Sequence, residues 1–145
     1  MRLPDVNVLL AGFRVDHVHH GLAYEFLEEA RSGNQPLGLS DFALTSVLRM
    51  ATNSRVFIEP DSADAVIEYI DVLLEAPGEL LRTGSTHFSR FTALCRSLQL
   101  RGNLIPDAYL AALAFEQGAE LVTFDRGFGR YPGLRWRCLL DSQDL

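Results

Sequence analysis

One stretch decides the fold: residues 102–128 read GNLIPDAYLAALAFEQGAELVTFDRGF. Its alanine-rich run has a high helix propensity, and the proline before that run is of a kind tolerated in the first turn of a helix. Gly118 is typical of a residue that ends a helix. The apolar residues 120–124 then predict a strand. The stretch therefore predicts a helix opened by Asp107, followed by a strand that leads into Asp125.

Outward from this stretch, short apolar segments alternate with amphipathic ones along the chain. Further strands are expected at residues 2–4, 36–39, 80–82 and 134–138, and further helices at residues 6–13, 20–31, 41–53, 61–76 and 86–100. Strands that alternate with helices predict an α/β fold, in which helices cover both faces of a mostly parallel central sheet. No repeat or low-complexity segment interrupts the chain, so residues 1–145 are expected to form one domain.

Some local features of these elements can also be predicted. Asp16 and Ser40 are residue types that cap helices, and they precede the segments 20–31 and 41–53. The strand at residues 80–82 is expected to be buried. In the segment 86–100, helical spacing predicts that Phe88, Phe91, Leu94, Cys95 and Leu98 face inward. His87, at the start of the same helix, is expected on the surface.

Every cationic side chain of this protein is an arginine, because the sequence contains no lysine. P-loop nucleotide hydrolases and Schiff-base enzymes need a lysine, so both classes are excluded. The charge is uneven as well: residues 1–81 carry five Arg and thirteen acidic residues, whereas residues 82–137 carry eight Arg and four acidic residues. The basic part could attract a phosphate backbone, or the asymmetry could be without function.

The sequence gives no sign of a membrane-bound or secreted protein. No apolar run approaches the ~18 residues that span a bilayer, and the N-terminus lacks the features of a signal peptide. Cys95 and Cys138 are too few and too far apart for a disulfide framework or a zinc site. We therefore expect a cytoplasmic protein with reduced thiols.

Four aspartates stand where a strand is expected to end or a helix to begin: Asp5, Asp41, Asp107 and Asp125. In a parallel sheet the carboxyl ends of the strands lie at one edge, so residues distant in sequence can meet there. Crowded carboxylates repel one another unless a cation neutralises them, and oxygen ligands suit Mg²⁺ or Mn²⁺. Structural roles are the alternative. Asp41 and Asp107 could complement helix N-termini, and Asp125 could be a turn residue.

Three segments together resemble the PIN-domain ribonucleases, and more narrowly the VapC toxins of bacterial toxin–antitoxin pairs. They are LPDVNVLL (3–10), LSDFALTSVLRMATNSRVF (39–57) and GNLIPDAYLAALAFEQGAELVTFDRGFGRYPGLRW (102–136). The last is the most specific, with an aspartate opening an alanine-rich helix and a strand that ends in T-x-D-R-x-F. The resemblance covers nearly the whole chain. It implies a PIN-like α/β/α sandwich.

The resemblance also implies an endoribonuclease that depends on Mg²⁺, with Mn²⁺ as a substitute. By position, Asp5, Asp107 and Asp125 match the acids that hold the metal. Thr123 matches a hydroxyl that supports the site, and Asn7 and Asn103 match polar residues beside it.

Two positions depart from the family pattern. The second acid is usually Glu, whereas this chain has Asp41, which is one methylene shorter and could reach a metal only through water. We expect it to help orient or deprotonate the attacking water. A fifth acid is often present where this chain has Gly127, so one metal is expected to bind firmly and a second only together with substrate phosphate.

The resemblance also suggests partners. VapC proteins form homodimers and are inhibited by a small antitoxin that covers the active-site groove. Arg126 and Arg130, close to Asp125, are candidates to bind RNA phosphates or antitoxin carboxylates. The sequence does not name the RNA target.

Other functions are weaker alternatives. A PIN-like binding module that has lost catalysis is suggested by the short Asp41 and the missing fifth acid, and Mn²⁺ titration would distinguish it. A phosphatase of the haloacid-dehalogenase type would need an Asp in place of Asn7 and a lysine. The segment 16–20, DHVHH, invites a transition-metal interpretation but lacks further ligands at zinc spacing. A Ser–His–Asp hydrolase would need a nucleophile elbow, which is absent.

Overall fold

A five-stranded sheet forms the centre of the computed structural model, which describes residues 1–143. In chain order its strands are β1 (Arg2–Pro4), β2 (Leu37–Ser40), β3 (Gly78–Leu81), β4 (Glu120–Thr123) and β5 (Trp136–Cys138). All neighbouring strands run parallel. The prediction of an α/β fold around a mostly parallel sheet is confirmed.

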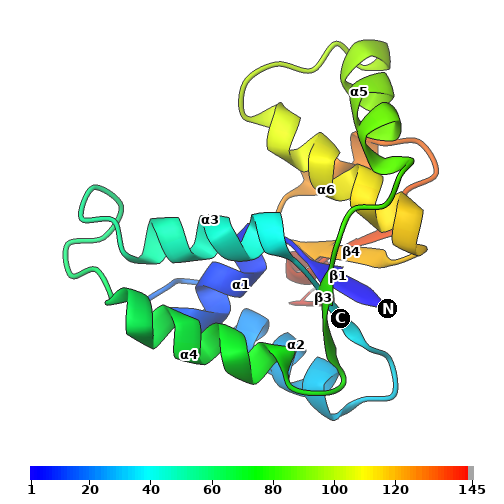
Figure 1. Cartoon of the computed structure of the whole chain (residues 1–145). Coiled ribbons are helices and arrows are strands. Elements are labelled where there is room, and N and C mark those ends of the chain that lie inside the picture. The colour runs from blue at the N-terminus through cyan, green and yellow to red at the C-terminus, as the bar shows by residue number, and fades with distance from the viewer. Residues whose placement is uncertain (144–145) are drawn as a thin grey trace.

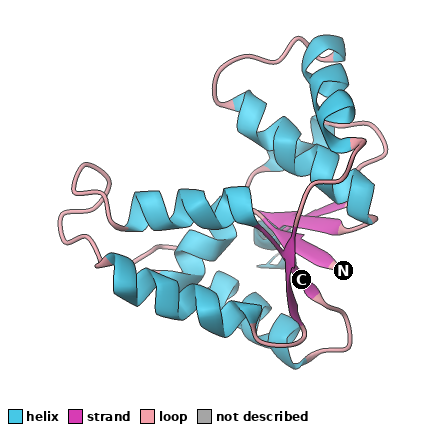
Figure 2. Cartoon of the chain, viewed as in Figure 1, coloured by secondary structure: helices cyan, strands magenta, loops and turns pink. Residues whose placement is uncertain are grey.

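Helices lie on both sides of this sheet. They are α1 (Val6–Phe13), α2 (His20–Ser32), α3 (Asp41–Ala51), α4 (Ala63–Leu74), α5 (His87–Ser97) and α6 (Leu104–Gln117), with 3₁₀ helices η1 (Arg126–Arg130) and η2 (Leu139–Gln143). Figure 1 shows α5 and α6 together on one side and α1, α2 and α4 on the other, with α3 extending away from the sheet between the two groups. Figure 2 shows the strands lying between these two groups of helices.

The order of the strands explains where a site can form. The sheet has the order β3-β2-β1-β4-β5, so the chain builds outward from β1 in one direction and then returns to the other side of β1 with β4. The carboxyl ends of β1 and β4 are neighbours at this reversal, because Pro4 pairs with Val122. In open α/β sheets, ligands bind beside such a reversal.

The core is made where the central strands meet the helices that flank them. Leu3 of β1 and Leu121 and Val122 of β4 are fully buried. The alanines of α6, such as Ala111, present no bulky side chain, so the helix approaches the sheet closely. Dense packing of this kind holds the ends of β1 and β4 in fixed positions.

The predicted helix ends are mostly correct. Ser40 caps α3 by accepting a hydrogen bond from the backbone N–H of Ala43 at 3.3 Å. Gly118 ends α6 in the left-handed conformation, with φ of 60°, which glycine adopts without strain. Asp16 does not cap α2, which begins at His20 after a residue that makes no side-chain cap. Its carboxylate is bound instead to the guanidinium of Arg14, at 2.9 Å.

Helix α5 is rotated relative to the prediction. His87 and Phe91 face α6, and the Nε2 of His87 donates a hydrogen bond to the carbonyl oxygen of Tyr109 at 3.0 Å. His87 is therefore 3% exposed, not a surface residue, while Phe88 on the other face is 71% exposed. Phe91, Leu94, Cys95 and Leu98 do pack against the core, as predicted.

The strand expected to be buried at residues 80–82 is instead an edge strand. It pairs only with β2, and Leu80 is 42% exposed. None of the helices in residues 1–143 has the length and apolar composition needed to cross a membrane.

Candidate metal centre

Asp5 lies at the exit of β1, where it also caps α1. Its Oδ1 accepts a hydrogen bond from the backbone N–H of Val6 at 2.7 Å, and its Oδ2 accepts one from the hydroxyl of Thr123 at 2.8 Å. Only 7% of the residue is exposed. The end of β1 thus places the Asp5 carboxylate in the interior of the protein. Each of its oxygens accepts one hydrogen bond and keeps a free lone pair.

Thr123 connects the ends of β1 and β4. Besides donating to Asp5, its Oγ1 accepts hydrogen bonds from the backbone N–H of Asp125 at 2.9 Å and from Nδ2 of Asn7 at 3.3 Å. The Oδ1 of Asn7 accepts in turn from the N–H of Phe124 at 3.3 Å. The predicted supporting positions, Thr123 and Asn7, therefore lie in one hydrogen-bonded network with Asp5.

Asp125 follows the end of β4 and opens η1. Its Oδ1 accepts a hydrogen bond from the backbone N–H of Gly127 at 2.7 Å, and the residue is exposed. Gly127 approaches this carboxylate so closely that a Cβ there would lie 2.9 Å from Asp125 Oδ1. A side chain at position 127 would require the side chains of Asp125 and Arg130 to move.

The three carboxylates influence one another electrostatically. Burial, followed by the charges of Asp5 and Asp125, raises the pKa of Asp107 to about 6, against the opposing effect of Arg130. Burial also raises the pKa of Asp5; its hydrogen bonds with Thr123 and Val6 act in the opposite direction, and the charge of Asp125 adds to the increase. The end of the sheet therefore concentrates negative charge from three separate segments.

This arrangement fits a hard divalent cation by donor type and by charge. Carboxylate oxygens are the preferred ligands of Mg²⁺ and Mn²⁺, and a cation would offset the repulsion that raises the pKa of Asp107. The side chains are not already gathered around a point. Within residues 1–143, no group of three or more His, Cys, Asp and Glu side chains is arranged so that it could hold a metal ion. Metal binding would therefore require these side chains to rearrange.

Asp41 and Asn103 are not brought into this group. Asp41 is the exposed first residue of α3, and its charge acts on Tyr109, whose pKa is raised mainly by burial and then by Asp41. Asn103 precedes α6 as an exposed residue that makes no side-chain cap. Among the predicted acids, Asp41 alone makes no described interaction with the others.

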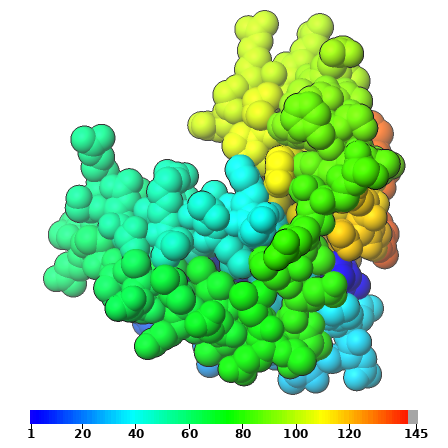
Figure 3. Space-filling model, viewed as in Figure 1, coloured from blue at the N-terminus to red at the C-terminus, as the bar shows by residue number. Residues whose placement is uncertain are grey.

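A cleft of about 440 Å³ opens in front of the acids, and Figure 3 shows the surface hollowed where α3 meets α6. Asp5 and Asp107 line it, together with Pro106 and Leu110 of α6. The opposite wall is a face of α3 that no sequence motif indicated as part of the site: Phe42, Thr45, Ser46, Arg49 and Met50. The spacing of these residues in the sequence indicates that they share one face of a helix. Only the packing of α3 beside α6 shows that this face borders the acids.

The predicted RNA-binding arginines lie beside the site and are already held by the protein. Arg126 pairs with Asp141, with 2.6 Å between Nη2 and Oδ1. The Nε of Arg130 donates to the carbonyl oxygen of Gly127 at 2.7 Å. Both also border a second hollow, of about 440 Å³, formed with residues 98–100 and Leu104.

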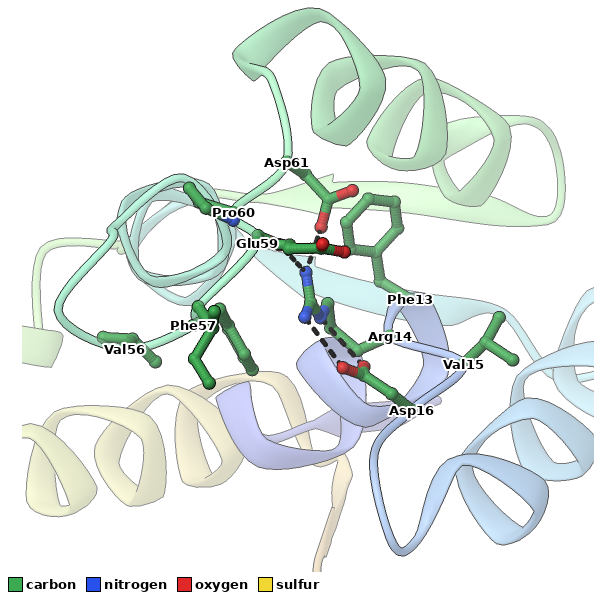
Figure 4. Close-up of a pocket in the computed structure, with 10 residues that line it drawn as sticks. Phe13, Arg14, Val15, Asp16, Val56, Phe57, Glu59, Pro60 and Asp61 are labelled. Carbon is green, nitrogen blue, oxygen red and sulfur yellow. Dashed lines mark hydrogen bonds and ion pairs between the residues drawn. The ribbon is translucent and has the colours of Figure 1, made fainter.

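A further hollow of about 1030 Å³ lies away from the acids, between the end of α1 and the segment before α4. Figure 4 shows Arg14 at its centre, bound to Asp16, Asp61 and the carbonyl oxygen of Glu59. The guanidinium also lies over the ring of Phe57, 3.9 Å from its centroid. The Asp16 carboxylate is therefore paired with Arg14 and is not free to act as the carboxylate ligand of a metal site in the DHVHH segment.

Comparison with known proteins gives matches over nearly the full length. The PIN-domain model matches residues 2–134. Ribonuclease VapC43 of Mycobacterium tuberculosis is 42% identical over 144 residues, which cover 99% of this chain and 98% of that protein. Ribonuclease VapC31 of the same organism is 32% identical over 136 residues, 93% of this chain and 96% of that protein.

Solved structures share the fold. VapBC2 from Rickettsia felis, bound to a DNA fragment from the promoter, matches with a TM-score of 0.71 and 19% identity over 94% of this chain and 97% of that one. VapC20 from Mycobacterium tuberculosis, a toxin that cleaves the sarcin–ricin loop, matches with a TM-score of 0.67 and 15% identity over 93% of this chain and 99% of that one.

Proposed function

This chain belongs to the PIN-domain family and, at 42% identity over 144 residues, to its VapC group; from this premise we propose that it is a Mg²⁺-dependent endoribonuclease and the toxin of a toxin–antitoxin pair. The observation that carries the proposal is the geometry where β1 and β4 end. The Asp5 carboxylate accepts a hydrogen bond from Thr123, whose hydroxyl accepts one from the backbone N–H of Asp125, and Asp5 and Asp107 line one cleft. Relatives over the full length are named ribonucleases.

In this proposal Asp5, Asp107 and Asp125 hold Mg²⁺, or Mn²⁺ as its substitute. The chemistry that the bound ion supplies is activation of the attacking water and stabilisation of the charge that builds on phosphorus. Thr123 fixes the orientation of the Asp5 carboxylate through its 2.8 Å hydrogen bond, and Asn7 fixes Thr123. The RNA phosphodiester would enter through the cleft between α3 and α6, beside Asp5 and Asp107.

Substitution of the acids tests the proposal. Asp5→Asn and Asp125→Asn should each abolish Mg²⁺-dependent cleavage of RNA, because an amide neither carries the charge nor binds the cation comparably. Asp71→Asn, an exposed residue of α4, is the matched control and should remain fully active. Circular dichroism checks that each variant is folded. Full activity of either site variant, or of the unmodified protein in EDTA, would contradict the proposal.

The proposal includes partners. We expect a small antitoxin that covers the cleft, a homodimer, and action in the cytoplasm, where the two free cysteines would stay reduced. A toxin of this kind should be encoded beside a short reading frame for its antitoxin. Co-expression of that frame should suppress both the growth defect and the RNA cleavage caused by this chain, whereas an unrelated antitoxin should not.

A further inference from the structure

The two walls of the cleft carry opposite charges. Asp5 and Asp107 lie on one side, where β1 ends and α6 begins. Arg49 is the one cationic residue among those that line the cleft, and it comes from α3 on the other side. An anion that enters the cleft would therefore meet Arg49 opposite the acids.

Arg49 is not held by the protein. It is exposed in the last turn of α3, and its guanidinium makes no hydrogen bond or ion pair with any other residue of the described 1–143. In that turn it complements the negative end of the helix, an interaction that leaves its guanidinium N–H groups available. Other arginines near the site differ, since Arg126 binds Asp141 and Arg130 binds the carbonyl oxygen of Gly127.

The face of α3 around Arg49 is suited to a nucleic-acid strand. Ser46 adds a hydroxyl group at helical spacing from it, whereas the Thr45 hydroxyl already donates to the carbonyl oxygen of Asp41 at 2.7 Å. Phe42 and Met50 add apolar surface at the two ends. Arginine binds phosphate with its planar set of donors, and hydroxyl groups commonly contact the backbone beside it. Three carboxylates, a divalent cation and a phosphodiester together leave excess negative charge, which an arginine opposite them would reduce.

We propose that Arg49 binds a phosphate of the RNA strand in the cleft between α3 and α6 and positions the strand against Asp5 and Asp107. This inference rests on the proposed ribonuclease function and adds to it a residue on the opposite wall. Arg49 is a substrate-binding residue in this scheme and takes no part in holding the metal.

RNA binding in EDTA tests the inference without dependence on turnover. The probe is a short fluorescein-labelled single-stranded RNA of mixed sequence, followed by anisotropy at several salt concentrations. Arg49→Gln should weaken binding about tenfold and lower the salt slope of log Kd by about 0.7, the effect of one lost phosphate contact. Arg49→Lys should keep most of the salt slope. In Mg²⁺, Arg49→Gln should raise KM for RNA cleavage more than it lowers kcat.

Arg55→Gln is the matched control, because Arg55 is exposed nearby, carries the same charge and does not line the cleft. Unchanged affinity and salt slope in Arg49→Gln would overturn the inference, and so would an equal loss in Arg55→Gln, or a loss confined to antitoxin binding. If the unmodified protein neither bound nor cleaved RNA, the proposed function itself would fail. Failure at Arg49 alone leaves that function intact.

Discussion

At the scale of single residues, Asp107 has the most informative environment. Its pKa is raised from 3.8 to about 6 by burial and by the charges of Asp5 and Asp125. A carboxyl whose folded-state pKa is raised stabilises the fold below its unfolded pKa, and this contribution is lost as the pH rises through the folded pKa. The ionisation of Asp107 therefore lowers the free energy of unfolding of the metal-free protein at neutral pH.

The substitution Asp107→Asn isolates this loss of free energy of unfolding, because the amide resembles the protonated carboxyl and does not ionise. In EDTA at about pH 4, the variant and the unmodified protein should have similar free energies of unfolding. As the pH rises through about 6, the unmodified protein should become the less stable of the two. Urea unfolding at a series of pH values measures the difference. A difference that is constant across this range would contradict the prediction.

Added Mg²⁺ should reverse the order at neutral pH. An ion that binds only the folded state stabilises it in proportion to its affinity, and Asp107→Asn removes one ligand. Thermal unfolding should show a larger increase in Tm with Mg²⁺ for the unmodified protein than for the variant. Equal increases would mean that the ion binds elsewhere.

At the scale of elements, sequence patterns predicted the positions of helices and strands better than their orientation. The segment 86–100 is helical as expected, but the inward face of α5 is set by Tyr109 of α6, which accepts the hydrogen bond of His87. In a sequence pattern, the hydrophobicity of Phe88 predicts that it faces inward. The pattern contains no information on Tyr109, which lies in another helix. Asp41 follows β2 as expected and is not among the residues that line the cleft, and its role as a catalytic acid stays a prediction.

Arg14 shows how an irregular element is held. The segment between α3 and α4 has little regular structure of its own, and the guanidinium binds both Asp61 and the carbonyl oxygen of Glu59 within it, at 2.8 and 2.9 Å. The Arg14 side chain is 10% exposed and that of Asp61 is 32% exposed, so the ion pair between them is partly shielded from water. One residue at the end of α1 therefore fixes a connector that lies far away in sequence.

Arg14→Gln should loosen this connector. Loss of the ion pairs and of the contact with the Phe57 ring should lower the free energy of unfolding by about 2 kcal/mol. Hydrogen exchange in residues 53–61 should accelerate more than in β1 or β4. Arg55→Gln, within the same connector but without a described side-chain contact, should change neither quantity. Unaltered exchange in Arg14→Gln would show that the connector is held in another way.

At the scale of the whole molecule, the sequence predicted the fold class, a mostly parallel sheet covered by helices. It predicted only part of the site. Asp5 and Asp125 follow strands that turn out to be neighbours, so the rule for parallel sheets placed them correctly. That rule locates the edge of a sheet but says nothing of side-chain direction or of the opposite wall. Arg49 and Ser46 were missed because their proximity to the acids depends on how α3 packs relative to α6.

The molecule also presents apolar surface that a partner could cover. Tyr24, Ile67 and Val72 are 53%, 42% and 39% exposed on α2 and α4. Because exposed apolar area favours association, we expect the purified chain to form a homodimer without its antitoxin. Light scattering should give twice the 16.2 kDa of one chain. A single-chain mass at all concentrations would contradict the dimer.

The hydroxyl of Thr123 has one donor and two acceptor positions, and Asp5, Asp125 and Asn7 occupy all three. Substitutions at Asn7 and Thr123 should therefore be non-additive, since either one removes a contact that the other shares. A change at the end of β1 would be tolerated only together with a compensating change at the end of β4. These two segments, separated by more than a hundred residues, are thus expected to vary in evolution as one unit.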